Sequence, residues 1–180
     1  MKRWSTMASG FLAWLAMAFL PVAAFAGPAK SIRLPAGLAH VATVEGISEY
    51  RLANGLRTVL FPDAGKPTAT INVTYLVGSR HENYGETGMA HLLEHLIFKG
   101  SKNFPDPARQ FQARGFDING STSLDRTNYY LTFPASDGNL RWALDWSADA
   151  MVNSFIARKD LESEMSVVRN EFEMGENEPA

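Results

Sequence analysis

The sequence contains no cysteine among its 180 residues, which excludes disulfide bonds, thiolate chemistry and a lipidated N-terminal cysteine. It also lacks low-complexity runs and any excess of basic side chains. Seventeen lysines and arginines stand against 19 aspartates and glutamates, a formal net charge of −2 at pH 7. Nothing in this balance suggests nucleic-acid binding. With 46% hydrophobic and 20% charged residues, the composition is typical of a globular protein.

The first 26 residues form a segment of a different kind. They combine a basic start, an apolar run that begins at Phe11, and small residues at Ala24 and Ala26. This pattern predicts a secretory signal peptide over residues 1–26, of the bacterial export type, removed after Ala26. We therefore expect a periplasmic or secreted protein without a stable membrane anchor after cleavage. An uncleaved anchor is the alternative, and Pro21 favours cleavage.

The residues after this segment begin with little pattern and then show clear β signals. Residues 27–47, rich in proline, glycine and alanine, are expected to be a lead-in segment, with regular structure from about Tyr50. Two β-prone runs around Asn54-Gly55 predict a hairpin with a type I′ turn, since both residues tolerate positive φ. The alternation in TATINVTYLVG predicts a strand with one buried face.

Helices dominate the remainder. Capping residues and apolar spacing predict four of them: one entered at Thr87 or Gly88 and stopped by Lys99 and Gly100, one between Asp106 and Gly115, one from Asn139, and one after Asp160. Two stripes recur at helical spacing: Leu140, Leu144, Ser147, Met151 and Phe155, then Leu161, Met165, Val168 and Phe172. The run RTNYYLTF predicts a strand that ends at Pro134. Because strands and helices alternate irregularly, the expected class is α+β, a mixed or antiparallel sheet packed with helices.

The run HLLEH carries the chemistry. His91, Glu94 and His95 occupy positions i, i+3 and i+4 of a predicted helix, so their side chains share one face. Two imidazoles at this spacing can bind one metal ion, and zinc is the natural ion for imidazole and carboxylate ligands. A hydrolytic zinc keeps one position open for water, and Glu94 can act as general base toward that water. The alternative is two solvated histidines paired with a glutamate.

The last predicted helix offers a third ligand. Glu164 and Glu171 are seven residues apart, so they share a face beside apolar side chains and have a reason to be partly buried. His40 and His81 have no partner at ligand spacing and are expected at the surface. Four further glutamates are expected to be solvated: Glu162, Glu173, Glu176 and Glu178.

HLLEH, followed after 75 residues by the glutamate of VVRNE, resembles the inverted zinc motif of the pitrilysin/insulinase family of metallopeptidases, which includes mitochondrial processing peptidase. GSRHENYGETGMAHLLEHLIFKGS, INGSTSLDRTNYY and EMSVVRNE occur in that family's order, so the resemblance covers essentially residues 48–175. It implies a pitrilysin-like domain and these roles: His91, His95 and Glu171 as ligands of one Zn²⁺, Glu94 as catalytic base, and Glu164 as a carboxylate that supports the ligands.

The resemblance also gives DINGSTS a role. In such enzymes this segment is similar to the sheet edge beside the metal, where an extended peptide adds as another strand. It implies that Asn119 and Gly120 contact a peptide or unfolded protein substrate, although the family more often has alanine where this chain has Gly120. A polar turn is the alternative. Tyr129 and Tyr130 are expected to pack in the sheet.

Family members carry at least two related domains that close around an unfolded peptide, whereas this sequence ends nine residues after Glu171. We therefore expect residues 48–180 to be the N-terminal part of a zinc peptidase domain, incomplete at its C-terminal end, with a second peptidase-like domain or subunit as a possible partner. Two functions stay open. One is a zinc-dependent endopeptidase; the other is a non-catalytic peptidase-like subunit, a peptide-binding module or an inactive fragment.

Overall fold

The computed structural model describes residues 34–177, so the predicted signal peptide over residues 1–26 lies outside the described residues. The chain divides into two compact units between Phe61 and Pro62. Within the described range, no helix has both the length and the apolar character needed to cross a lipid bilayer.

The described part of the first unit is an antiparallel sheet of three strands, β1 (Leu38–Val44), β2 (Ile47–Leu52) and β3 (Arg57–Leu60), in that order. Regular structure thus begins at Leu38, and the expected start near Tyr50 was too late. All but one residue of β1 are exposed, so the strand has no apolar alternation from which it could be recognised.

The hairpin predicted around Asn54-Gly55 is confirmed, because β2 and β3 pair on either side of it. The predicted type I′ turn is wrong. Gly55 has a φ of 92°, but Asn54 is not among the residues with positive φ. Instead, the side-chain oxygen of Asn54 accepts the backbone N–H of Leu56 at 3.1 Å, a local contact that asparagine often makes in turns. Only the glycine then needs the left-handed conformation.

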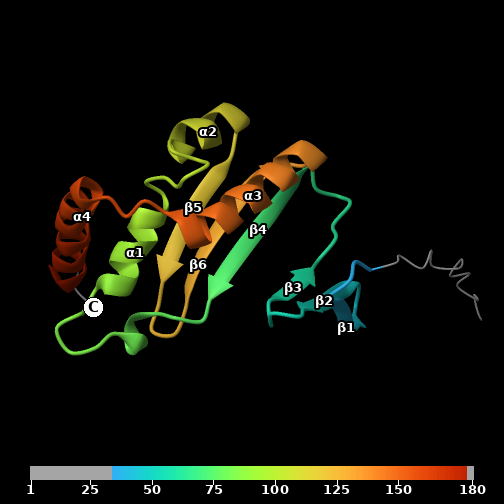
Figure 1. Ribbon diagram of the computed structural model, residues 1–180, viewed down its shortest axis with the longest axis horizontal. Helices are drawn as coiled ribbons and strands as arrows, with labels where there is room; N and C mark the ends of the chain where they lie inside the picture. The colour runs from blue at the N-terminus through green and yellow to red at the C-terminus, as the bar shows by residue number, and fades with distance from the viewer. Residues whose placement is uncertain (1–33, 178–180) are drawn as a thin grey trace, which may run out of the picture. The chain divides into compact units, whose positions relative to one another are not determined.

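The second unit is built on a sheet of three antiparallel strands in the order β4–β6–β5, formed by β4 (Thr68–Tyr75), β6 (Thr127–Pro134) and β5 (Asp117–Thr122) (Figure 1). Its helices are α1 (Met89–Ile97), α2 (Pro107–Arg114), α3 (Asp137–Asn153) and α4 (Arg158–Asn177), with a short 3₁₀ helix, η1 (Ser79–His81), before α1. The α+β class is confirmed. Within the described residues, β5 is an edge strand of this sheet.

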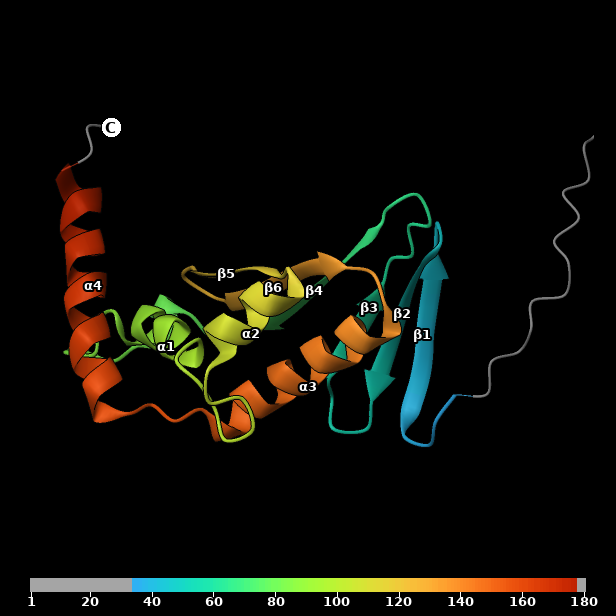
Figure 2. The same ribbon diagram turned by 90° about the horizontal axis from the view of Figure 1, so that it is seen from above.

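Helices α1, α2 and α3 lie on the same face of the sheet (Figure 2). On β6, alternate residues point into this layer, and Leu131 and Phe133 are 0% and 1% exposed. They pack with Phe111 of α2 and Trp146 of α3 to form the core. Alternation along the neighbouring strands sets which of their side chains face the helices. Ile118 of β5, opposite Leu131, lies on that face.

The ends of α2 follow the sequence prediction. The Asp106 carboxylate accepts the N–H of Arg109 at 3.2 Å, Pro107 occupies the first turn, and Gly115 closes the helix with a φ of 67°. The buried face of α3 differs from the predicted stripe. Ala143, Trp146, Asp149 and Ala150 are buried, whereas Leu140, Leu144 and Met151 are 42–51% exposed. Spacing identified the helix, but it could not rank two adjacent faces that both carry apolar residues.

Asp149 fastens the loop after α1 to the end of α3. Its carboxylate is buried and accepts hydrogen bonds from the Ser101 hydroxyl at 2.6 Å, from the backbone and side chain of Asn103 at 3.0 and 2.6 Å, and from Asn153 at 2.7 Å. These hydrogen bonds lower the pKa of Asp149 from 3.8 to about 2, and the bond from Ser101 has the largest effect. The ionised carboxylate therefore holds this loop, which connects α1 to α2.

The first prediction concerns this contact. Asp149→Ala removes the acceptor of several partly buried donors, so we expect the melting temperature to fall by several degrees at pH 7. Because the pKa is lower in the folded chain than the ordinary 3.8, this stabilisation is complete above about pH 4 and is lost as the pH falls toward 2. Thermal melts between about pH 4 and pH 2 should show the melting temperatures of the parental protein and of Asp149→Ala converging as the pH falls. Asp145→Ala, an exposed carboxylate on the same helix, is the control. Equal losses from both variants would contradict the role of Asp149.

Candidate metal centre

Helix α1 carries the central part of the site and is fixed at its start by a carboxylate. Gly88 precedes it with a φ of 93°, and Glu82 accepts the backbone N–H groups of Gly88 at 2.9 Å and Ala90 at 2.8 Å. A negative charge at the N-terminus of a helix also interacts favourably with the helix dipole. Leu92 and Leu96 are 2% and 3% exposed, so the apolar side of α1 is buried.

The structure brings together three residues that were predicted as metal ligands. The Nε2 atoms of His91 and His95 are 3.3 Å apart. One oxygen of Glu171, from α4, lies 3.4 Å from the Nε2 of His91 and 3.5 Å from that of His95. The side chains of His91 and Glu171 remain 37% and 40% exposed. The three donor atoms therefore form a nearly equilateral triangle that solvent can reach.

These distances provide a test of whether the donors suit zinc. Ligands about 2.0–2.2 Å from a tetrahedral zinc are separated from one another by roughly 3.3–3.6 Å. The three observed separations, 3.3, 3.4 and 3.5 Å, fall in this range. Two imidazoles and one carboxylate are also the donor types that a catalytic zinc uses, with a fourth position left for water. The residues present therefore fit one zinc ion.

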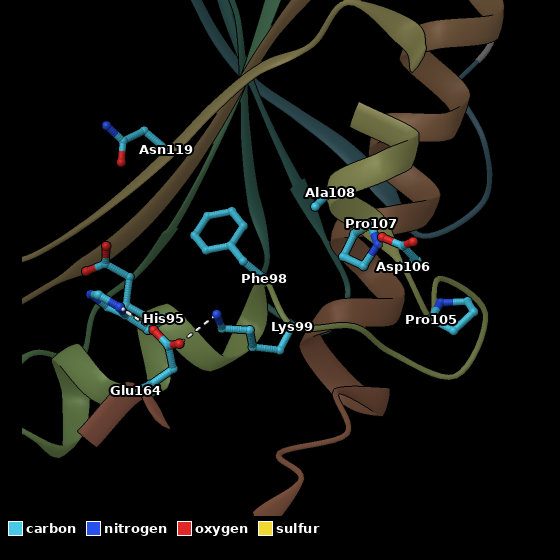
Figure 3. Close-up of a pocket in the computed structure, with 10 residues that line it drawn as sticks. His95, Phe98, Lys99, Pro105, Asp106, Pro107, Ala108, Asn119 and Glu164 are labelled. Carbon is cyan, nitrogen blue, oxygen red and sulfur yellow. Dashed lines mark hydrogen bonds and ion pairs between the residues drawn. The ribbon is translucent and has the colours of Figure 1, made fainter. Parts of the chain in front are cut away.

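Glu164, also from α4, contacts the other side of His95 (Figure 3). One of its oxygens lies 3.0 Å from Nδ1 of His95, and the other lies 2.6 Å from the ammonium group of Lys99. Although burial raises the pKa of Glu164, the hydrogen bonds from Lys99 and His95 outweigh that effect and leave the pKa below its ordinary value. An ionised Glu164 accepts a hydrogen bond from Nδ1–H of His95, so the lone pair of His95 is on Nε2, which faces His91 and Glu171.

Glu94 lies between the two histidines in sequence, but its side chain packs against β5. It is 7% exposed, and one oxygen, Oε2, accepts the hydroxyl of Thr122 at 2.6 Å. A Cβ atom on Gly120 would lie 2.6 Å from the other oxygen, Oε1, and 3.0 Å from the carboxyl carbon. The glycine thus leaves room for Glu94 to approach the strand. This contact gives a structural reason for glycine at position 120, which the sequence alone did not supply.

The segment that contains Asn119 and Gly120 is a strand, β5, and the alternative of a polar turn is wrong. Asn119 is exposed and its side-chain oxygen accepts the N–H of Gly120 at 2.8 Å. Its side chain points away from His95 and Glu164 (Figure 3). The contact of Asn119 and Gly120 with substrate stays a prediction.

A cavity of about 440 Å³ opens beside the site (Figure 3). It extends from Glu94 and His95, past Phe98, to Pro107 and Ala108 at the start of α2. Both polar and apolar side chains line it. The cavity therefore provides space next to the candidate base and one candidate ligand.

The structure also tests the predictions made for Tyr129, His40 and His81. Tyr129 is buried and packs in the sheet layer, with its ring 5.8 Å from that of Tyr75 and 5.6 Å from that of Phe98. Burial raises the pKa of Tyr129 above its ordinary value. His40 and His81 are exposed, as predicted.

Sequence reasoning missed two residues that contact the site, Lys99 and Thr122, and one that fixes the start of helix α1, Glu82. Lys99 follows His95 by four residues, so helical spacing could have indicated it. Thr122 is two residues after Gly120 and shares its face of β5, but no sequence signal links it to Glu94, 28 residues earlier. Glu82 binds a helix that begins seven residues later, across an irregular loop with no recognisable capping motif.

The sequence is similar to proteins named as zinc proteases and as a subunit of a mitochondrial-processing peptidase. The chain is 35% identical over 135 residues to an uncharacterised zinc protease of Bacillus subtilis, covering 74% of this chain and 32% of that protein. It is 34% identical over 146 residues to the beta subunit of the mitochondrial-processing peptidase of Bos taurus, covering 78% and 29%. The chain thus spans about a third of the length of the curated relatives it matches.

The solved structures that resemble this chain are also those of proteases. The crystal structure of pitrilysin matches with a TM-score of 0.67 at 27% identity, over 77% of this chain and 16% of that one. The first half of the periplasmic protease PqqL from Escherichia coli matches with a TM-score of 0.70 at 25% identity, over 79% and 32%. Residues 57–180 match the family described as Insulinase (Peptidase family M16). The chain belongs to this family of metallopeptidases, and it corresponds to an N-terminal portion of such a protein.

Proposed function

We propose that this protein is a zinc-dependent endopeptidase that hydrolyses peptides or unfolded polypeptide segments. The observation that carries the proposal is the triangle of donor atoms from His91, His95 and Glu171, whose sides of 3.3–3.5 Å suit a tetrahedral zinc. Membership of the insulinase family supports it. A non-catalytic subunit would not need a complete donor set beside a buried carboxylate.

Each residue of the site has a separate task in this proposal. His91, His95 and Glu171 would hold a zinc ion, and its positive charge would lower the pKa of a bound water molecule and polarise the peptide carbonyl. Glu94 accepts a proton from the attacking water and later donates it to the leaving amine. Glu164 holds His95 in the required tautomer and orientation through Nδ1, and Lys99 balances the charge of Glu164.

The edge strand β5 suits an extended substrate. Its unpaired side can accept a peptide as a further strand through main-chain hydrogen bonds, which places Asn119 and Gly120 beside the peptide. Because the chain spans about a third of its relatives, we further propose that a second peptidase-like domain or subunit completes the substrate site. Two of the similar proteins are consistent with such a partner: one is named as the beta subunit of a processing peptidase, and the other is the first half of the longer protease PqqL.

Metal binding is the first test, and all variants should be made in the protein expressed from its whole reading frame. His95→Ala and Glu171→Gln should abolish stoichiometric zinc, because the first removes an imidazole ligand and the second replaces the anionic carboxylate ligand by a neutral amide. Glu164→Gln removes only the charged partner of the His95 Nδ1 atom, so it should weaken zinc affinity by about 10–100-fold. Glu162→Gln, an exposed side chain of α4, is the control and should keep full affinity.

The measurement is zinc content by elemental analysis, with affinity from competition with a chelator. Full zinc occupancy in His95→Ala would refute the proposed ligand set. If Glu164→Gln lost more affinity than Glu171→Gln, the roles assigned to the two glutamates would be exchanged.

Catalysis by Glu94 is tested by Glu94→Gln, which keeps the volume of the side chain but removes the proton acceptor. We expect zinc content and KM to stay near the parental values while kcat falls by about 10²–10⁴-fold. Zinc content, melting temperature and peptide cleavage should be measured on one preparation. A variant that holds its zinc and cleaves at close to the parental rate would show that Glu94 is not the base.

We also propose that the protein acts in the periplasm or outside the cell, on the strength of the signal-like pattern in residues 1–26. Expression in a bacterial host should then yield a mature protein that begins at Gly27. N-terminal sequencing of the exported protein, with cell fractionation, tests this. Recovery of the intact Met1 terminus in the membrane fraction would instead indicate an uncleaved anchor.

A further inference from the structure

We propose that Thr122 is a positioning residue for catalysis: its hydroxyl fixes one oxygen of Glu94 on β5, so that the other oxygen is presented in a single orientation for proton transfer. The inference rests on the proposed function of Glu94 as general base. It assigns a task to a side chain that touches no metal donor.

The contact has the properties of a strong hydrogen bond. The Thr122 hydroxyl oxygen lies 2.6 Å from Oε2 of Glu94, and Glu94 is 7% exposed. An ionised carboxylate can only accept, so the hydroxyl must donate. Hydrogen bonds from a hydroxyl to a carboxylate are short, and they are stronger than those between neutral groups. Little water is available at this buried side chain to replace the contact.

A second threonine leaves the proton of Thr122 free for Glu94. Thr127, directly opposite Thr122 in the β5–β6 register, donates its own hydroxyl to the carbonyl of Val77 at 2.9 Å. The two threonine oxygens are 3.3 Å apart. Each hydroxyl has one proton, and that of Thr127 is used by the carbonyl. Thr122 therefore directs its proton to Glu94.

Gly120, on the same face of β5, lies against the other oxygen of the carboxylate. Its missing side chain leaves the space in which Oε1 lies, since a Cβ there would be 2.6 Å from Oε1 and 2.9 Å from Cγ of Glu94. Among the residues that the structure describes, none donates a hydrogen bond to Oε1. One oxygen is thus bound and the other has no protein partner in this range, as an oxygen that takes a proton from water requires.

Orientation matters because a glutamate side chain has several rotatable bonds and a general base must lie within hydrogen-bond reach of the proton it takes. Without the Thr122 hydroxyl, the Glu94 carboxylate would sample other rotations about its last bond. The zinc donors, which come from α1 and α4, do not depend on Thr122. Loss of the hydroxyl should therefore affect the rate and leave metal binding unchanged.

The experiment compares Thr122→Val, Thr122→Ser and Thr127→Val in the zinc-loaded full-length protein. Valine keeps the shape of threonine without the hydroxyl, so Thr122→Val should lower kcat by about 10–100-fold. KM and the zinc dissociation constant should stay within about twofold of the parental values. Thr122→Ser restores the hydroxyl and should recover most of the rate. Thr127→Val removes an adjacent hydroxyl, and we expect lower thermal stability with kcat retained.

Two further measurements separate this inference from the proposed function. Crystals of Thr122→Val should show the Glu94 carboxylate rotated or in more than one conformer. In a Glu94→Gln background, Thr122→Val should cause almost no further loss of rate. If Glu94→Gln is inactive while Thr122→Val keeps the parental kcat, or loses zinc affinity instead, the inference fails and the proposed base stands. If Glu94→Gln itself is fully active, the proposed function fails.

Discussion

Helix α1 lies between β5 and α4, and neighbouring side chains of one of its faces contact each of them. Glu94 points to β5, where the Thr122 hydroxyl binds it, while His91 and His95 point to α4. A rotation of α1 about its axis would break both sets of contacts together. The buried leucines Leu92 and Leu96, with Glu82 at the start of the helix, prevent that rotation. The geometry of the candidate site therefore depends on how α1 is packed.

Helix α4 supplies two carboxylates from one face, and its packing on α1 gives them different partners. Glu171 faces the Nε2 atoms of both histidines, whereas Glu164 reaches Nδ1 of His95 and the ammonium of Lys99. Glu164 is the more buried of the two. A carboxylate with two charged or polar partners can be buried at acceptable cost, because its lone pairs are satisfied. The more exposed Glu171 has one oxygen directed at the two imidazoles.

The sequence was sufficient for features set by local spacing. HLLEH on a helix places its histidines on one face regardless of the rest of the fold, and Asp106 and Gly115 marked the ends of α2 correctly. Features that depend on packing between distant segments could not be predicted from spacing. Examples are the contact of Thr122 with Glu94 and the buried face of α3. Spacing alone also left Glu164 and Glu171 equivalent, and the resemblance to a family was needed to assign them different roles.

The central claim is that His91, His95 and Glu171 together bind one zinc ion. Anomalous diffraction at the zinc absorption edge, from crystals of the full-length protein, tests it most directly. The account predicts a single strong peak about 2.0–2.2 Å from Nε2 of His91, Nε2 of His95 and a carboxylate oxygen of Glu171. A protein saturated with zinc whose anomalous peak lies elsewhere, or is coordinated by Glu164 in place of Glu171, would contradict it.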